Sequence, residues 1–252
     1  MIFGLNSYLL TTIDRSHANV TEPTRNARWD WLMSDWGVQA EGGVKRQVTV
    51  FSSEVAVDLG FLKVTKTTLS YTLPHGLRLP DGGNPQQTRF TIDRRNSAAA
   101  LVFQPATGLL HFVHQFRFAT YNPADEPTPE NGWLIELAAG VIERNESSKE
   151  SIAREISEEL GFNEIKSLEL IGSFYLSPGA ASERLFLYCA CVGGSDMPMI
   201  DHSLGDADEW IEAVSMTVPD FLGRVEAIEV FDAKMVAAAE YIRRRPDLFG
   251  VG

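Results

Sequence analysis

The chain has 252 residues, of which 44% are hydrophobic, and this suits one large globular domain or two small ones. A formal net charge of −12, with no broad basic patch, argues against a nucleic-acid groove or an anionic membrane surface as the main partner. Because the chain lacks both a secretory-signal pattern and an apolar run of roughly eighteen residues, we expect a soluble, cytoplasmic protein.

Residues 1–45 form an N-terminal extension with few regular patterns. Three tryptophans, Trp29, Trp31 and Trp36, lie in a segment with the spacing of a short amphipathic helix that ends at Gly37. We favour packing in the core or at an interface as their role, over stacking on a ligand.

Residues 46–96 are predicted to form an antiparallel β subdomain. Val, Thr, Leu and Phe alternate with polar residues along 47–73, around a turn near Gly60. A turn-rich connection over 75–87 precedes another strand at 88–94.

The remaining domain, residues 97–252, opens with a predicted hairpin formed by residues 98–105 and 109–118. His111 and His114 lie three apart in its second strand, on opposite faces, and are therefore poor candidates for a metal pair. Cys189 and Cys191 share one face of a later strand and are too close for an ordinary disulfide, so we expect buried thiols in a reducing compartment.

Residues 140–162 carry the most informative pattern. Ser147 and Glu150 form a capping box that predicts a helix beginning near residue 148, and Gly161 is a typical stop. Charge pattern alone favours a solvated acidic face for this helix. Towards the C-terminus, helical spacing follows Pro219 and ends in three arginines at 243–245, where the helix dipole favours cations.

The spacing of identities in this stretch resembles the signature box of the Nudix hydrolases. It runs Gly-x5-Glu-x7-Arg-Glu-aliphatic-x-Glu-Glu-x-Gly-apolar from Gly140, and Phe162 departs from the usual aliphatic residue at its end. Shorter segments, QFRFATY, LIELAAG, SPGAASE, DADEWIEAV and FDAKMVAAA, resemble the ADP-ribose and GDP-mannose pyrophosphatase branch of that family. Together the resemblance covers roughly residues 45 to 247.

The resemblance implies an α/β fold, a Nudix-type α/β/α sandwich on a mixed sheet, with an N-terminal antiparallel strand subdomain that often exchanges across a homodimer. It implies Mg²⁺ or Mn²⁺ as cofactor, and hard cations of this kind prefer oxygen ligands. The residues that it assigns to the metal are Glu155, Glu158, Glu159 and the carbonyl of Ala139. Arg154 is expected to pair with Glu146 and tie the preceding loop to the helix, whereas Glu150 serves only the cap.

On the substrate side, the resemblance assigns Arg117 to a phosphate, with a surface salt bridge as the alternative role. Glu136 matches a residue near the metal or the ribose, and Glu183 matches a substrate-side acid, with turn stabilisation as the alternative. Glu209 matches a mobile-loop acid that binds metal or helps to activate water. Ala207 stands where some relatives carry another glutamate, which leaves the general base unassigned.

The implied activity is that of a Nudix pyrophosphatase, a phosphoanhydride hydrolase. We expect it to cleave a nucleoside diphosphate sugar of the ADP-ribose, GDP-mannose or UDP-glucose type to a nucleoside monophosphate and a sugar phosphate. The alternatives are a nucleotide-sugar sensor that binds without cutting and a purely structural role. All the box carboxylates are present, and no basic recognition helix accompanies them, which favours the enzyme over the sensor.

Overall fold

The computed structural model describes residues 47–60, 62–73, 77–123, 131–194, 210–227 and 232–250. The chain divides into two units, Met1–Gly43 and Val44–Gly252, and every described residue belongs to the second. The predictions for the three N-terminal tryptophans and for Glu209 therefore lie outside the described residues.

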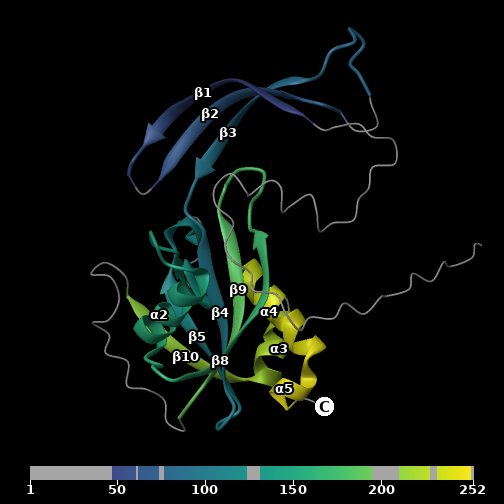
Figure 1. Ribbon diagram of the computed structural model, residues 1–252. Coiled ribbons are helices and arrows are strands. Elements are labelled where there is room, and N and C mark those ends of the chain that lie inside the picture. The colour runs from purple at the N-terminus through teal and green to yellow at the C-terminus, as the bar shows by residue number, and fades with distance from the viewer. Residues whose placement is uncertain are drawn as a thin grey trace, which may run out of the picture. The chain divides into compact units, whose positions relative to one another are not determined.

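The described elements follow one another as strands with helices concentrated towards the C-terminus (Figure 1). In chain order they are β1 (Val48–Asp58), β2 (Lys63–Tyr71), β3 (Gln86–Asp93), β4 (Ser97–Gln104), β5 (Leu109–Phe116), the 3₁₀ turn η2 (Phe118–Thr120), β6 (Trp133–Glu136), β7 (Ala138–Val141), α2 (Ser148–Leu160), β8 (Ile165–Tyr175), β9 (Arg184–Val192), β10 (Ile211–Thr217), α3 (Val218–Glu226), α4 (Ala233–Arg244) and α5 (Pro246–Phe249). Among the described residues, none of these helices combines the length and the apolar character that a membrane span requires.

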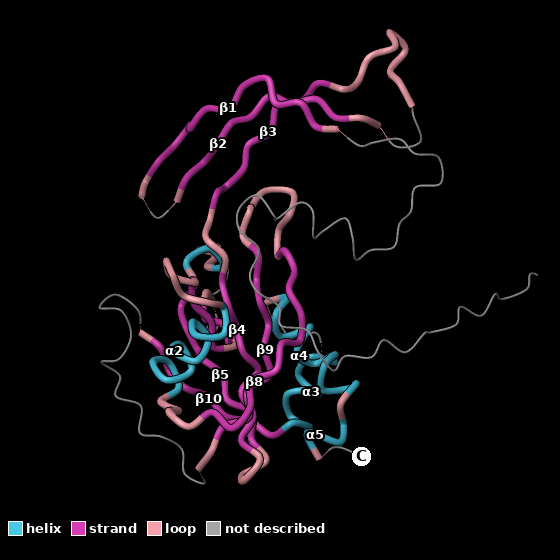
Figure 2. Tube along the Cα trace, in the orientation of Figure 1, coloured by secondary structure: helices cyan, strands magenta, loops and turns pink. Residues whose placement is uncertain are grey.

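The first sheet contains β1, β2 and β3 in that order, all antiparallel, as the alternating pattern predicted (Figure 2). Val48 pairs with Tyr71 and Val50 with Leu69, so these four side chains share one face. A register shift between Val50 and Ser52 keeps Val55, further along β1, on the same face.

The second sheet has the strand order β10-β5-β4-β9-β8, with β6 paired to β5 and β7 paired to β4. It is mixed, as expected, because β4 and β9 are parallel while the other pairs are antiparallel. One core cluster includes the apolar residues of α2, and the other includes those of α3, α4 and α5. The helices thus cover opposite faces of this sheet, which gives the predicted α/β/α layers (Figure 1).

The middle of this sheet divides between β4 and β5. The two strands pair only where Val102 to Gln104 face His111 to Leu109. The earlier part of β4 pairs with β7 instead, and the later part of β5 pairs with β6. Leu137 joins β6 to β7 at this division. We use the term fork for the place around Leu137 where β4 and β5 separate and pair with β7 and β6. Side chains next to Leu137 therefore lie where the sheet opens.

Local signals determine α2 as the sequence predicted. Ser147 caps the helix by accepting from the Glu150 backbone N–H, and the Glu150 side chain completes the capping box. Gly161 ends the helix in the left-handed conformation at a φ of 73°.

The C-terminal helical stretch is divided into separate helices. α3 ends at Glu226, and α4 begins only after Asp232, whose side chain accepts from the backbone N–H groups of Lys234 and Met235. An Asp at this position starts a new helix because its carboxylate satisfies amides that have no partner within the helix. Arg243 and Arg244 lie in the last turn of α4, as the dipole argument predicted.

His111 and His114 have separate surroundings, as predicted for opposite faces. His111 is buried, with Nδ1 2.8 Å from Ser215 Oγ and Nε2 3.2 Å from Gln104 Oε1. Burial lowers the pKa of His111 to about 4, so the ring is neutral at pH 7. The two cysteines are free, buried thiols, as expected.

Candidate active site

Two glutamates of α2 lie directly against β7. Glu159 Oε2 accepts a hydrogen bond of 2.9 Å from the Ala139 backbone N–H. Glu155 lies next to Gly140, so closely that a Cβ on that glycine would be 1.7 Å from Glu155 Oε1. The glycine is therefore required by the carboxylate and not by a special backbone conformation. The structure brings together Glu155, Glu159 and Ala139, three of the four positions assigned to the metal.

Arg154 connects the loop before α2 to three glutamates. Its Nε is 3.1 Å and its Nη2 3.3 Å from the two Glu146 oxygens, which is the predicted bidentate pair. The Nη1 atom lies 2.8 Å from both Glu155 Oε1 and Glu158 Oε2. Glu146 also accepts a 3.0 Å hydrogen bond from the Glu143 backbone N–H, which further fixes the loop. One planar guanidinium thus organises three carboxylates.

The local surroundings shift the pKa values of these charged side chains in different directions. Burial raises the pKa of Glu155, and the nearby Arg154 opposes that shift only in part. The hydrogen bond from Arg154 lowers the pKa of Glu146, with the Glu143 backbone N–H adding to the effect. The same pair with Glu146 raises the pKa of Arg154, which stays charged at any physiological pH.

The donor chemistry here suits a hard divalent cation. Glu155 and Glu159 present carboxylate oxygens on a rigid helix beside the backbone of Ala139, and Mg²⁺ and Mn²⁺ prefer such ligands. Within the described residues, no three His, Cys, Asp or Glu side chains gather as closely as the ligands of one ion. Glu158 accepts a hydrogen bond from Arg154 Nη1. It is the most exposed of the three glutamates assigned to the metal.

A second charged cluster lies at the fork. Arg117 Nε donates to Glu136 Oε2 at 2.6 Å, so the structure brings together two of the three residues predicted for substrate. Lys234 Nζ is 3.5 Å from Glu136 Oε1 and also contacts Asp232 Oδ2. The Glu136 side chain is only 7% exposed, which makes it the centre of the cluster.

The two acids of this cluster influence one another. Burial, and then a hydrogen bond with Asp232, raises the pKa of Glu136. Burial alone would raise the pKa of Asp232 too, but the hydrogen bond with Glu136 and the charge of Lys234 outweigh it and leave that pKa lowered. Asp232 is therefore the more readily ionised of the two.

Glu183 precedes β9 and already has partners in this structure. Ser97 Oγ donates to its Oε1 at 2.7 Å, and Arg94 Nη1 lies 3.3 Å from its Oε2. Both partners belong to the segment that leads from β3 into β4, so these contacts stabilise that connection. The role of Glu183 as a substrate-side acid stays a prediction.

Asp232 and Lys234 were not assigned any role from the sequence. The only local signal was an Asp just before a helical run, which is typical of an N-cap. Nothing in the pattern marks the lysine, because lysines in a first turn are normally exposed. Its partner Glu136 lies 98 positions earlier in the chain, beyond the reach of spacing rules.

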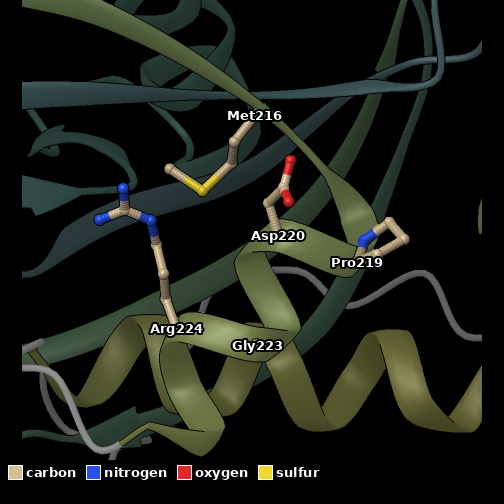
Figure 3. A pocket seen from close by; sticks show the side chains of 5 residues that line it. All are labelled: Met216, Pro219, Asp220, Gly223 and Arg224. Carbon is tan, nitrogen blue, oxygen red and sulfur yellow. The ribbon is translucent and has the colours of Figure 1, made fainter.

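A surface pocket lies away from the carboxylates of α2. It is lined by Met216, Pro219, Asp220, Gly223 and Arg224, at the end of β10 and along α3 (Figure 3). Since α3 packs on the opposite face of the sheet from α2, this pocket belongs to a different surface. Asp220 is occupied in capping α3, where its backbone N–H and carboxylate both bond Thr217 Oγ1.

Known proteins resemble the chain over most of the described region. The model of the NUDIX domain family matches residues 93–238. A GDP-mannose pyrophosphatase of Yersinia enterocolitica is 30% identical over 164 residues, which are 64% of this chain and 80% of that protein. An ADP-ribose pyrophosphatase of Bacillus subtilis is 29% identical over 173 residues, 68% of this chain and 84% of its own. A crystal structure described as an ADP compounds hydrolase aligns with a TM-score of 0.58 at 17% identity, covering 82% of this chain and 97% of that one, and this likeness concerns the fold.

Proposed function

Because the chain belongs to the NUDIX domain family, we propose that it is a divalent-metal-dependent pyrophosphatase that hydrolyses a nucleoside diphosphate sugar. The observation that carries the proposal is the placement of Glu155 and Glu159 against Gly140 and Ala139, with Arg154 fixing the loop to the helix. The pyrophosphatase activity named for two relatives supports the reaction class. ADP-ribose and GDP-mannose are the first substrates to test, followed by UDP-glucose.

The reaction is the attack of one water on a phosphorus of the diphosphate. The new P–O bond forms as the bridging P–O bond of the anhydride breaks, which yields a nucleoside monophosphate and a sugar phosphate. The water proton passes to a carboxylate. The resemblance suggests Glu209 for this role, and that residue lies outside the described residues. Mg²⁺ or Mn²⁺, held by Glu155, Glu159 and the Ala139 carbonyl with Glu158 beside them, would neutralise phosphoryl charge and acidify the water.

The protein residues around this centre have separable tasks. Arg154 holds Glu146 and Glu155 in fixed positions, so a change there acts through geometry. Arg117 presents a guanidinium at the fork, and the planar array of N–H donors in a guanidinium complements diphosphate oxygens. Glu136 orients that guanidinium through Nε.

The test is turnover of ADP-ribose, GDP-mannose, UDP-glucose and NADH, each with and without Mg²⁺, with products separated by chromatography. The Glu159→Gln variant, purified identically, is the control for contaminating phosphatases. We expect a monophosphate and a sugar phosphate only from the wild-type protein with metal. Running the reaction in ¹⁸O-labelled water identifies the attacked phosphorus. Tight binding of these compounds with no turnover would contradict the enzyme and favour a sensor.

We further propose that the protein forms a homodimer through the face of its first sheet that carries Val48, Val50 and Val55. Val48, Val50 and Val55 are 67%, 57% and 54% exposed on a face that they share with Leu69 and Tyr71. Exposed apolar side chains on one face of a three-stranded sheet favour a covering layer. A second copy of the same sheet supplies one by two-fold symmetry.

The oligomeric state can be measured by light scattering coupled to size-exclusion chromatography. Val50→Glu should yield a monomer, since it places a charge among the exposed valines of the proposed interface. Ser52→Glu is the matched control, because Ser52 pairs with Thr68 on the opposite face of the same strand. A monomeric wild-type protein, or a dimer that survives Val50→Glu, would contradict this interface. A cytoplasmic location is part of the proposal too, and two buried free thiols support it.

A further inference from the structure

Lys234 occupies a position that is unfavourable for a lysine in two ways. Its side chain is only 11% exposed, and lysines are seldom buried unless they are paired. It also lies in the first turn of α4, where the helix dipole disfavours a positive charge. An uncharged residue would fill the same space with a smaller loss of folding free energy.

The partners of Lys234 show what the charge does. Asp232 holds the ammonium group through Oδ2 and accepts the Lys234 backbone N–H through Oδ1 at 2.8 Å. From this anchor the side chain reaches Glu136 Oε1 at the fork, 3.5 Å away. The other oxygen of Glu136 accepts from Arg117 Nε at 2.6 Å. The contacts thus run from Asp232 through Lys234 and Glu136 to Arg117, which is 41% exposed.

We propose that Lys234 is a positioning residue for the substrate diphosphate, acting through Glu136 on Arg117. The inference rests on the proposed function, in which Arg117 binds a phosphate. By occupying Glu136 Oε1, Lys234 leaves a single oxygen for Arg117 and restricts their contact to Nε. Among the described residues, the two Nη groups of Arg117 have no partner, so they are the donors available to phosphate oxygens.

Loss of the ammonium group would change how Glu136 and Arg117 pair. A carboxylate with both oxygens available favours a bidentate contact with a guanidinium. Arg117 would then turn an Nη group towards Glu136 and present fewer donors to the diphosphate. Substrate binding weakens, while the carboxylates of α2 keep their places against β7.

The central experiment compares Lys234→Met with the wild-type protein. KM and kcat are measured on the nucleoside diphosphate sugar that the wild type cleaves fastest. The Kd of the methylene-bridged, non-hydrolysable analogue of ADP-ribose is measured by calorimetry. We expect KM and Kd to rise about tenfold, the size of a lost charged hydrogen bond, with kcat within about twofold. Lys166→Met, which removes an exposed lysine from β8, should change none of these.

Two further variants distinguish positioning from a general loss of stability. Asp232→Asn keeps an N-cap for α4 but withdraws the charge beside Lys234, and should raise KM in the same direction by a smaller factor. In Arg117→Ala, the added Lys234→Met change should cost nothing more, because the residue through which it acts is already gone. If Lys234→Met does not fold, the Asp232→Asn variant and its combination with Arg117→Ala provide the same comparison.

The outcomes separate this inference from the proposed activity. A folded Lys234→Met protein with unchanged KM and Kd overturns the inference and leaves hydrolysis established. So does a fall in kcat alone, or an effect that multiplies with that of Arg117→Ala. Wild-type protein that binds the analogue but cleaves nothing refutes the proposed hydrolysis, and the Kd comparison still decides the role of Lys234. Wild-type protein that neither binds nor cleaves refutes both.

Discussion

Substituting Gly140 with alanine tests the placement of Glu155 without changing any charge. The added Cβ would lie 1.7 Å from Glu155 Oε1 and 2.1 Å from its Cδ. The carboxylate must therefore retreat by about 1.5 Å or more to reach an ordinary van der Waals separation. Misplacing a group at a reacting centre by about 1 Å can cost about 100-fold in rate. We expect kcat to fall by at least about that factor.

The stability of the Gly140→Ala protein should change little. Gly140 is not among the residues with positive φ, so alanine fits the backbone of β7. The atoms that must move are the end of a flexible side chain, and alanine reduces the entropy of the unfolded chain. We expect the free energy of unfolding to stay within about 1 kcal/mol of the wild-type value.

The assay is the initial rate at saturating Mg²⁺ and substrate, together with urea unfolding of the same preparations. Gly172→Ala is the matched control, because Gly172 lies in β8 and an added Cβ there meets nothing within 4 Å. That variant should keep wild-type activity. Undiminished turnover by Gly140→Ala would refute the reasoning that Glu155 works from its position beside β7.

Three other predictions concern the same domain. Glu159→Gln should abolish hydrolysis and leave urea unfolding almost unchanged, and full activity would contradict the assignment of Glu159 to the metal. Arg154→Lys should lower kcat/KM by about tenfold, because one ammonium cannot hold three carboxylates as a planar guanidinium does, whereas Arg144→Lys in the exposed loop should have no effect. His111 should make the fold less stable in acid. The pKa of His111 is about 4 in the folded protein and 6.5 in the unfolded chain, so the unfolded chain binds more protons between these pH values. The free energy of unfolding therefore decreases as the pH is lowered. From pH 7 to pH 5 this amounts to about 2 kcal/mol. Urea unfolding at both pH values should show that His111→Gln loses less stability than the wild type, and equal losses would contradict the account.

The parts of the site that could be predicted from sequence are those that lie on one helix. Ser147, Glu150 and Gly161 determine where α2 begins and ends through contacts within a few residues. The relative placement of Arg154 and the glutamates then follows from helix geometry, and the pair with Glu146 was found as expected.

The fork could not be predicted, because it depends on which strands pair. The short pairing of β4 with β5, and the insertion of β6 and β7 between them, are decided by packing across the whole sheet. Residues 133–140 contribute to two separate strands, β6 and β7, on either side of Leu137. The role of Lys234 follows from this division, since the lysine meets Glu136 only where the sheet opens.

The distance along the chain between Glu136 and Lys234 has a consequence for synthesis on the ribosome. The two residues are 98 positions apart, so about 5 to 20 s pass between the addition of one and the other at ordinary rates of translation. Until α4 has left the ribosome and packed on the sheet, Glu136 has no contact with the Lys234 ammonium group. Its carboxyl group is then most stable in contact with water, with the fork open. A nascent chain that has completed α2 therefore holds its box carboxylates on a finished helix while Arg117 is still unaligned. On this proposal, the final alignment of Arg117 for substrate is made when α4, one of the last helices to be synthesised, packs on the sheet.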